Sequence, residues 1–205
     1  MKKILFIFLT ACFFFSCEKE TIVIPQQHAG RTVLAFFWAD NSLNSNLRNN
    51  IRTMMQGLQA MKDSAALLVY WDGEASDISW PEPCIVEYVT NGQGGINSMS
   101  KEAVNAMIAD QDMSVHDLIS IGNIRKKYSP QTSTEKTVMQ TVIGDMMSVY
   151  PSESYGIIFG SHGSGWLPTI TGTRSIGQDG GRYSSDTALI PELAEVLRTV
   201  NPQKV

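Results

Sequence analysis

The stretch that decides the fold is YGIIFGSHGSGW, residues 155–166, in which an apolar run leads into a glycine-rich turn. Residues 155–160 predict a strand inside a sheet, because a short apolar run bounded by turn residues is typical of one. Such a strand carries the residues after it to the carboxyl edge of an open α/β sheet, where ligands bind. His162 is therefore expected at the edge where chemistry takes place.

Two residues of this turn can take part in catalysis. His162 can exchange a proton near neutral pH. Gly163 has no side chain, so its backbone can approach a substrate and its amide can stabilise an oxyanion. Together they predict an acid/base group beside an amide donor, which is half of a catalytic site, because a nucleophile is still needed. The alternative is that His162 is a hydrogen-bonded turn residue, since short motif matches often arise by chance.

The rest of the chain alternates between apolar runs, which predict strands, and apolar residues at helical spacing, which predict helices. Strands are expected at residues 32–38, 65–71 and 85–89, helices at 43–61, 101–109, 115–124, 133–150 and 189–200, and a loop at 172–186. Strands that alternate with helices pair in parallel, so the sequence predicts an α/β layered fold with a mainly parallel sheet.

The beginning of the chain has the pattern of an export leader. After two lysines, Ile4–Phe15 is an apolar run. It has the length of a signal-peptide core, ~7–15 residues, and is too short for a transmembrane helix, which needs ~20. The run leads to Cys17, preceded by a small residue, which resembles a bacterial lipoprotein signal. We expect residues 1–17 to be this signal with Cys17 lipidated, 18–30 to be a tether, and 31–205 to form the domain. The alternative is that the apolar run is a buried element of the fold.

A lipid on Cys17 would anchor the protein to a membrane of the bacterial cell envelope, either facing the periplasm or exposed on the surface.

The net charge is −4 at pH 7 with no basic stripe, which argues against a nucleic-acid-binding protein. The chain has 3 cysteines. Cys12 and Cys17 lie in the leader, so Cys84 has no partner for a disulfide within the domain. No Cys/His cluster has the spacing of a zinc site, and no metal ligand is assigned.

The segment at residues 155–166 closely resembles the histidine segment of the clostripain family of cysteine peptidases, which belongs with caspases, gingipains and legumain. Residues 32–43, which contain VLAFFWADNSL, resemble the family's first strand and its A-D-N-x-L continuation. Residues 190–197, IPELAEVL, are similar to the helix that precedes the family's cysteine strand. The three matches occur in the family's order along the chain.

This resemblance implies a caspase-like sandwich and a Cys/His dyad that cleaves peptides or proteins after Arg or Lys, with calcium required in several members. His162 matches the dyad histidine and Gly163 the oxyanion glycine. The family's cysteine, and the acidic residue that reads the basic side chain, lie on a strand that would begin after Val205. We therefore expect the domain to be truncated before the nucleophile strand and the chain to be inactive alone. Arg174 and Arg182 are candidate self-cleavage sites, and the alternative is an ordinary solvated loop.

Four other residues with reactive or ionisable side chains have weaker links to the site. Cys84 comes before its strand and before the histidine, the reverse of the family's order, so we expect a small core residue and not the nucleophile. Asp40 closes the first strand and either supports the active-site edge or caps the helix that follows. His28 lies in the tether, and His116 lies on an amphipathic helix. The competing function is a non-catalytic lipoprotein of the same fold, acting as a binding module or an inactive remnant.

Overall fold

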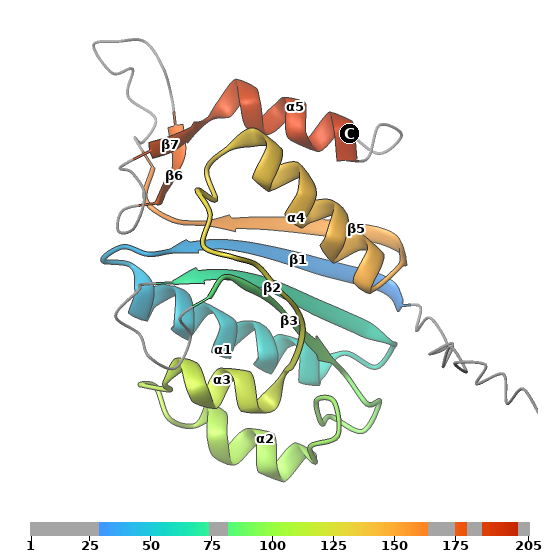
Figure 1. Ribbon diagram of the computed structural model, residues 1–205. Helices are drawn as coiled ribbons and strands as arrows, with labels where there is room; N and C mark the ends of the chain where they lie inside the picture. The colour runs from blue at the N-terminus through green and yellow to red at the C-terminus, as the bar shows by residue number, and fades with distance from the viewer. Residues whose placement is uncertain (1–28, 74–81, 164–174, 180–185, 201–205) are drawn as a thin grey trace, which may run out of the picture.

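The computed structural model describes residues 29–73, 82–163, 175–179 and 186–200. A five-stranded sheet stands between two layers of helices, and a two-stranded hairpin lies at one edge of it (Figure 1). The strands are β1 (Ala29–Ala39), β2 (Ala65–Gly73), β3 (Cys84–Val89), β4 (Asn123–Lys127), β5 (Ser152–Gly160), β6 (Ser175–Asp179) and β7 (Asp186–Leu189). The helices are α1 (Asn44–Ala60), α2 (Lys101–Ile108), α3 (Val115–Ile121), α4 (Lys136–Val149) and α5 (Ile190–Val200).

The strand order of the sheet is β4-β3-β2-β1-β5. β1 pairs in parallel with β2 and with β5, whereas β3 is antiparallel to β2 and β4 is antiparallel to β3. The carboxyl ends of β1, β2 and β5 therefore meet at one edge, which lies on the left in Figure 1 beside the hairpin of β6 and β7. The expected α/β layered fold is confirmed, and an antiparallel pair of strands extends its parallel part.

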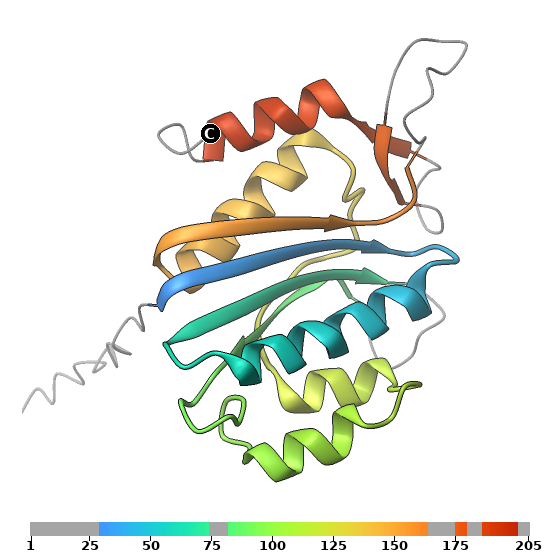
Figure 2. The ribbon, with the colours of Figure 1, turned by 180° about the vertical axis from the view of Figure 1, so that it is seen from behind.

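Helices cover both faces of the sheet, which is why the central strands are continuous apolar runs. α1, α2 and α3 lie against one face and α4 and α5 against the other, as the reverse view in Figure 2 also shows. Side chains of β1 alternate between the two layers. Phe37 packs in the cluster under α1, and Phe36 and Trp38 pack in the cluster under α4. All three side chains are at most 1% exposed.

The helix expected at residues 115–124 is shorter than predicted, because α3 ends at Ile121 and Gly122 follows as its C-cap. A Cβ on Gly122 would lie 2.4 Å from Cγ1 of Val86, so the chain passes too close to β3 for any larger residue. The residues that follow form β4, a strand that the sequence did not predict. All five β4 residues are exposed, so they do not show the alternation that marks a half-buried strand.

The loop expected at residues 172–186 contains β6 and the start of β7, so that part of the prediction is wrong. β6 packs against the end of β1 through Gly177, whose φ is 87°. A Cβ there would lie 3.1 Å from the ring of Trp38, and a positive φ also favours glycine. This close contact fixes the hairpin at the carboxyl edge of the sheet.

β5 lies at the edge of the sheet and is more exposed than β1. Ile158 is 41% exposed, whereas Ala35, its partner in the register, is 0% exposed. On the face that these two residues share, α1 packs over β1 and β2. No helix in the described ranges is long and apolar enough to cross a membrane. Residues 1–28, with the expected signal and Cys17, lie outside the described residues.

Candidate active site

The turn after β5 is held by β6 through backbone atoms. The amide of Gly177 donates a hydrogen bond to the carbonyl oxygen of His162 at 2.9 Å, and Gly163 forms an antiparallel bridge with Ile176. In antiparallel pairing, the pair next to such a bond is not itself hydrogen-bonded, and its amides point away from the partner strand. The Gly163 amide is therefore turned away from β6.

Two residues from the turn after β1 contact the same segment. Ser42 Oγ lies 2.9 Å from Nε2 of His162, and Asn41 Nδ2 donates to Oγ of Ser161 at 3.3 Å. The structure thus brings together the turns at residues 40–42 and 161–163, which belong to the two motif segments noted separately in the sequence. From the sequence, residues 40–42 were expected only as a turn and helix start, and Asn41 and Ser42 were given no role in the site. The available signal was that both follow a strand expected to end at the same edge as the histidine strand.

The backbone register explains why the two turns meet. β1 and β5 run in parallel, and Phe37 pairs with Gly160. A Cβ on Gly160 would lie 2.6 Å from the ring of Phe37, so only glycine lets β5 pass this ring in the observed position. His162 follows two residues later and is half-buried.

Asp40 is the first residue after β1 and is 5% exposed. The N-cap of α1 is Leu43, and no side chain caps that helix, so the capping interpretation of Asp40 is wrong. The helix is instead started by Asn41, whose Oδ1 accepts a hydrogen bond from the amide of Leu43 at 2.9 Å. Asn41 therefore organises this turn locally and also reaches β5.

A buried polar cluster lies at the end of β2, at the same edge of the sheet. Ser133 Oγ donates to the carboxylate of Asp72 and shares a hydrogen bond of 2.7 Å with the hydroxyl of Tyr70. Gln131 Nε2 donates to that hydroxyl at 3.1 Å. These bonds fasten the segment before α4 to β2, and the four side chains include neither a thiol nor an imidazole. We interpret the cluster as part of the frame of this edge.

Cys84 is at the carboxyl edge, although it begins its strand, because β3 is antiparallel to β2. Its place at the start of the strand therefore does not by itself remove it from the edge that carries His162, but two other observations separate it from that residue. Cys84, Trp71, Phe37 and Gly160 are successive partners across the sheet, which puts Cys84 three strand spacings, about 14 Å, from β5. Its side chain is also 0% exposed. A nucleophile must come within ~2.6–3.2 Å of its base, so Cys84 cannot serve His162.

Other residues considered in the sequence are distant or outside the described ranges. His116 is exposed on α3, which covers the far side of the sheet from α4. Arg174 and Arg182 lie outside the described residues. Within the described ranges no group of three or more His, Cys, Asp or Glu residues could hold a metal ion. No chemical step is assigned to calcium.

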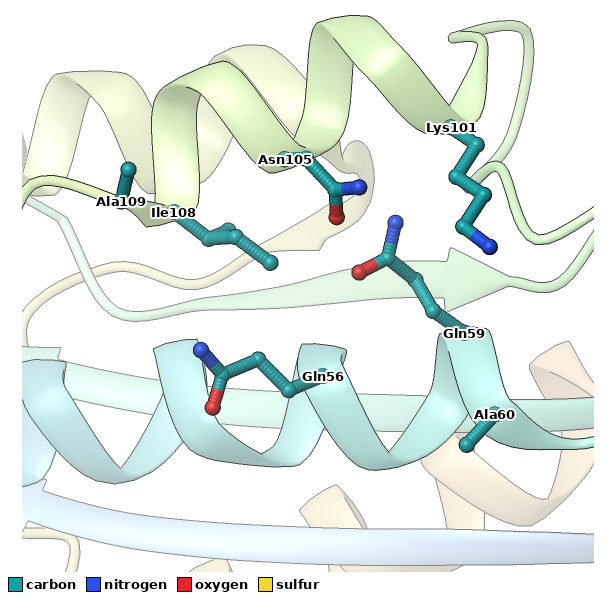
Figure 3. A pocket seen from close by; sticks show the side chains of 7 residues that line it. All are labelled: Gln56, Gln59, Ala60, Lys101, Asn105, Ile108 and Ala109. Carbon is teal, nitrogen blue, oxygen red and sulfur yellow. The ribbon is translucent and has the colours of Figure 1, made fainter.

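A groove of about 460 Å³ lies between α1 and α2 (Figure 3). It is lined by Gln56, Gln59, Ala60, Lys101, Asn105, Ile108 and Ala109. The α1 residues of the groove are at the far end of that helix from Ser42, roughly 20 Å along its axis. The groove is therefore separate from the turn that carries His162.

Comparison with known proteins identifies the family. The sequence model of the clostripain family matches residues 35–205. A secreted C11 cysteine protease from Bacteroides thetaiotaomicron, solved with an irreversible peptide inhibitor, is similar with a TM-score of 0.56 and 28% identity over 84% of this chain. Another structure, a secreted C11 cysteine protease from the same organism named iotapain, has a TM-score of 0.56 and 16% identity over 85% of this chain and 43% of its own, and shows the shared fold. No curated protein matches.

This chain spans 39% of the length of the inhibitor-bound protease. The family match covers residues 155–166 and all but the first three residues of 32–43, and it confirms the resemblance noted in the sequence. The chain belongs to the clostripain family of cysteine peptidases.

Proposed function

We propose that this chain is the histidine-bearing part of a cysteine endopeptidase that cleaves after Arg or Lys, with a Cys/His dyad whose cysteine is not among these 205 residues. The observation that carries the proposal is the turn of His162 and Gly163. It projects from the carboxyl edge of a clostripain-type sheet, it is held by β6, and its glycine amide is turned away from β6.

Each residue of the turn has a defined role in this proposal. His162 removes the proton from a cysteine thiol, and the thiolate then attacks the carbonyl carbon of the scissile peptide bond. The Gly163 amide donates a hydrogen bond to the oxyanion that forms on the carbonyl oxygen. The protonated His162 then gives its proton to the leaving amine, which leaves an acyl-enzyme that water hydrolyses.

The proposal places the cysteine on a further strand paired with the outer edge of β5. A strand in that position would lie about 4.8 Å from β5, so its carboxyl end would reach the His162 turn. The exposure of Ile158, at 41% within the apolar second half of β5, supports this placement.

Four further features are proposed from the sequence and the family resemblance. Residues 1–17 direct export and lipidation at Cys17, which anchors the protein at the bacterial cell envelope. Arg174 and Arg182 are sites of self-cleavage. Substrates are peptides or proteins with a basic residue before the cut. Any calcium that the peptidase needs would bind to groups other than those tested above.

The test uses the peptidase that contains the nucleophile strand and fluorogenic peptides with Arg, Lys or an uncharged residue before the cut. His162→Ala is expected to lower kcat/KM for the basic peptides by ~10²–10⁴-fold, the usual contribution of a general base. The matched control is His116→Ala, which removes an exposed imidazole on α3 and is expected to leave kcat/KM unchanged. Full activity in His162→Ala would refute the proposal. Absence of any turnover in the wild-type protein would favour the non-catalytic alternative, a binding module or inactive remnant.

A further inference from the structure

The side chain of His162 has its two ring nitrogens in different surroundings. Nε2 lies 2.9 Å from Ser42 Oγ. Within the described residues, no hydrogen bond is made by Nδ1. In a neutral imidazole one nitrogen donates and the other accepts, so the partner of Nε2 decides which nitrogen is free to act as a base.

We propose that Ser42 is a positioning residue whose hydroxyl oxygen accepts the Nε2–H hydrogen bond of His162, leaving Nδ1 as the nitrogen that exchanges protons with the nucleophile and the leaving group. This inference rests on the proposed role of His162 as the base. In the proton-transfer step, Nδ1 takes the thiol proton while Nε2 keeps its own. The resulting imidazolium therefore still donates from Nε2 to the same oxygen, and Nδ1–H later protonates the leaving amine.

A serine hydroxyl suits this task because it is exposed and has lone pairs to spare. Its oxygen accepts the Nε2–H bond while its own proton is donated to water, so the contact persists whether the ring is neutral or charged. A hydrogen bond to the charged imidazolium is stronger than one to the neutral ring. Ser42 therefore holds the ring in one orientation through the reaction.

Asn41 supports this geometry by fixing the turn on which Ser42 lies. Its Nδ2 donates to the carbonyl oxygen of Trp38 at 2.7 Å and to Ser161 Oγ at 3.3 Å. One amide therefore ties the end of β1 to the residue before His162. This bridge sets the distance between the two turns and thus between Ser42 and the imidazole.

The first test is spectroscopic and does not need activity. The full chain is labelled with ¹⁵N-histidine, and its 3 histidines are assigned by substitution. At about pH 8, where an ordinary histidine is neutral, His162 is expected to show a protonated Nε2 and an unprotonated Nδ1. In Ser42→Ala the two ¹⁵N shifts should move toward those of exposed His116, whereas Ser42→Thr should retain the wild-type shifts. Ser45→Ala, an exposed serine on α1 nearby, is the matched control.

The second test is kinetic and uses the peptidase that contains the nucleophile strand. Ser42→Ala is expected to lower kcat about tenfold with KM unchanged, the effect of losing one hydrogen bond to a charged group, and Ser42→Thr should restore it. A protonated Nδ1 in the wild type, or unchanged kcat in Ser42→Ala, would overturn the positioning role. If His162→Ala stays active, the proposed function fails and this role with it, while the labelled spectra still report separately on whether the Ser42 contact exists.

Discussion

The two edges of the sheet are built differently. β4 has five residues, all exposed, and three of them are basic. Each basic side chain forms an ion pair between its nitrogen and a carboxylate oxygen: Arg125 with Glu87 at 3.5 Å, Lys126 with Asp145 at 2.5 Å, and Lys127 with Glu82 at 3.7 Å. β5 has nine residues, and its second half is the apolar run of residues 156–160. Charged residues on a short edge strand discourage the addition of another strand, whereas a long apolar edge invites it.

The two edge strands share one feature, since each carries one exposed isoleucine. Ile124 on β4 is 40% exposed and Ile158 on β5 is 41% exposed. By exposure alone the two positions are equivalent, and only the surrounding sequence separates them. The difference shows that β4 has the composition of a finished edge and β5 that of a strand suited to pairing on both sides.

The largest expected effect comes from placing a lysine at these two positions. In the peptidase that contains the nucleophile strand, Ile158→Lys should lower the free energy of unfolding by about 3 kcal/mol, because the charge would be buried under the added structure. Ile124→Lys should change it by no more than about 0.5 kcal/mol, as is usual for exposed positions. Urea unfolding of both variants measures the difference. Equal, small effects would mean that nothing covers β5 and would break the distinction between the edges.

A smaller effect is expected from two glycines on β5 itself. Gly160→Ala should cost about 2 kcal/mol, since its Cβ would collide with the ring of Phe37 at 2.6 Å and with Cδ2 of Leu47 at 2.8 Å. Gly156→Ala meets nothing within 4 Å and should be neutral or slightly stabilising, because alanine has less conformational entropy to lose. Thermal or urea unfolding of the 205-residue chain gives both values. If Gly156→Ala were the more damaging variant, the described path of β5 over β1 would be wrong.

The smallest effect concerns the ion pair behind β4. Glu87 is 4% exposed, and burial raises its pKa, against the opposing influence of the Arg125 guanidinium and of a hydrogen bond with Asn123. The Glu87 carboxyl therefore ionises at a lower pH in the unfolded chain than in the folded one. The wild type is expected to be most stable relative to Glu87→Gln below pH 4.5, and to lose that advantage as the pH rises through the raised pKa.

Urea unfolding of the wild type and Glu87→Gln at several pH values across this range shows whether the difference in their free energies of unfolding falls as the pH rises. Glu82→Gln is the matched control, because the Glu82 side chain is 49% exposed beside Lys127 at the same edge. It removes an exposed carboxylate and is expected to change the free energy of unfolding by no more than about 0.5 kcal/mol. A wild type that gained stability over Glu87→Gln as the pH rose would show that the ion pair with Arg125 outweighs burial.

Much of the central fold could be predicted because local pattern and tertiary role agree there. The runs that became β1 and β2 are apolar because both of their faces are covered, and the run in β5 is apolar although only its face toward α4 packs against the core. α1 and α4 show helical spacing because one side of each helix is buried. β4 was missed because Asn123–Lys127 is exposed and polar, so burial left no pattern in it. The antiparallel direction of β3 was also not predicted, because strand direction depends on the path of the connection and not on composition.

Only the part of the candidate site that follows β5 was predicted from the sequence. His162 and Gly163 lie within one short motif, so their proximity follows from the sequence. Ser42 is separated from His162 by 120 residues, and their contact depends on the parallel register of β1 and β5. The sequence offered a motif at residues 39–43 but no means to know which of its side chains would face the histidine.

The hold of β6 on the His162 turn has a consequence for how this family can diverge. The contact is made by main-chain atoms of Gly177 and His162, which every residue except proline can supply in the donor position. The hydrogen bond itself therefore does not depend on the side chains of β6, although Ile176 packs against the hydrophobic cluster under α4. Gly177 is the exception, because the ring of Trp38 occupies the place of its missing Cβ. In more divergent relatives, a paired tryptophan and glycine at these positions would mark this strand better than any similarity in the rest of its sequence.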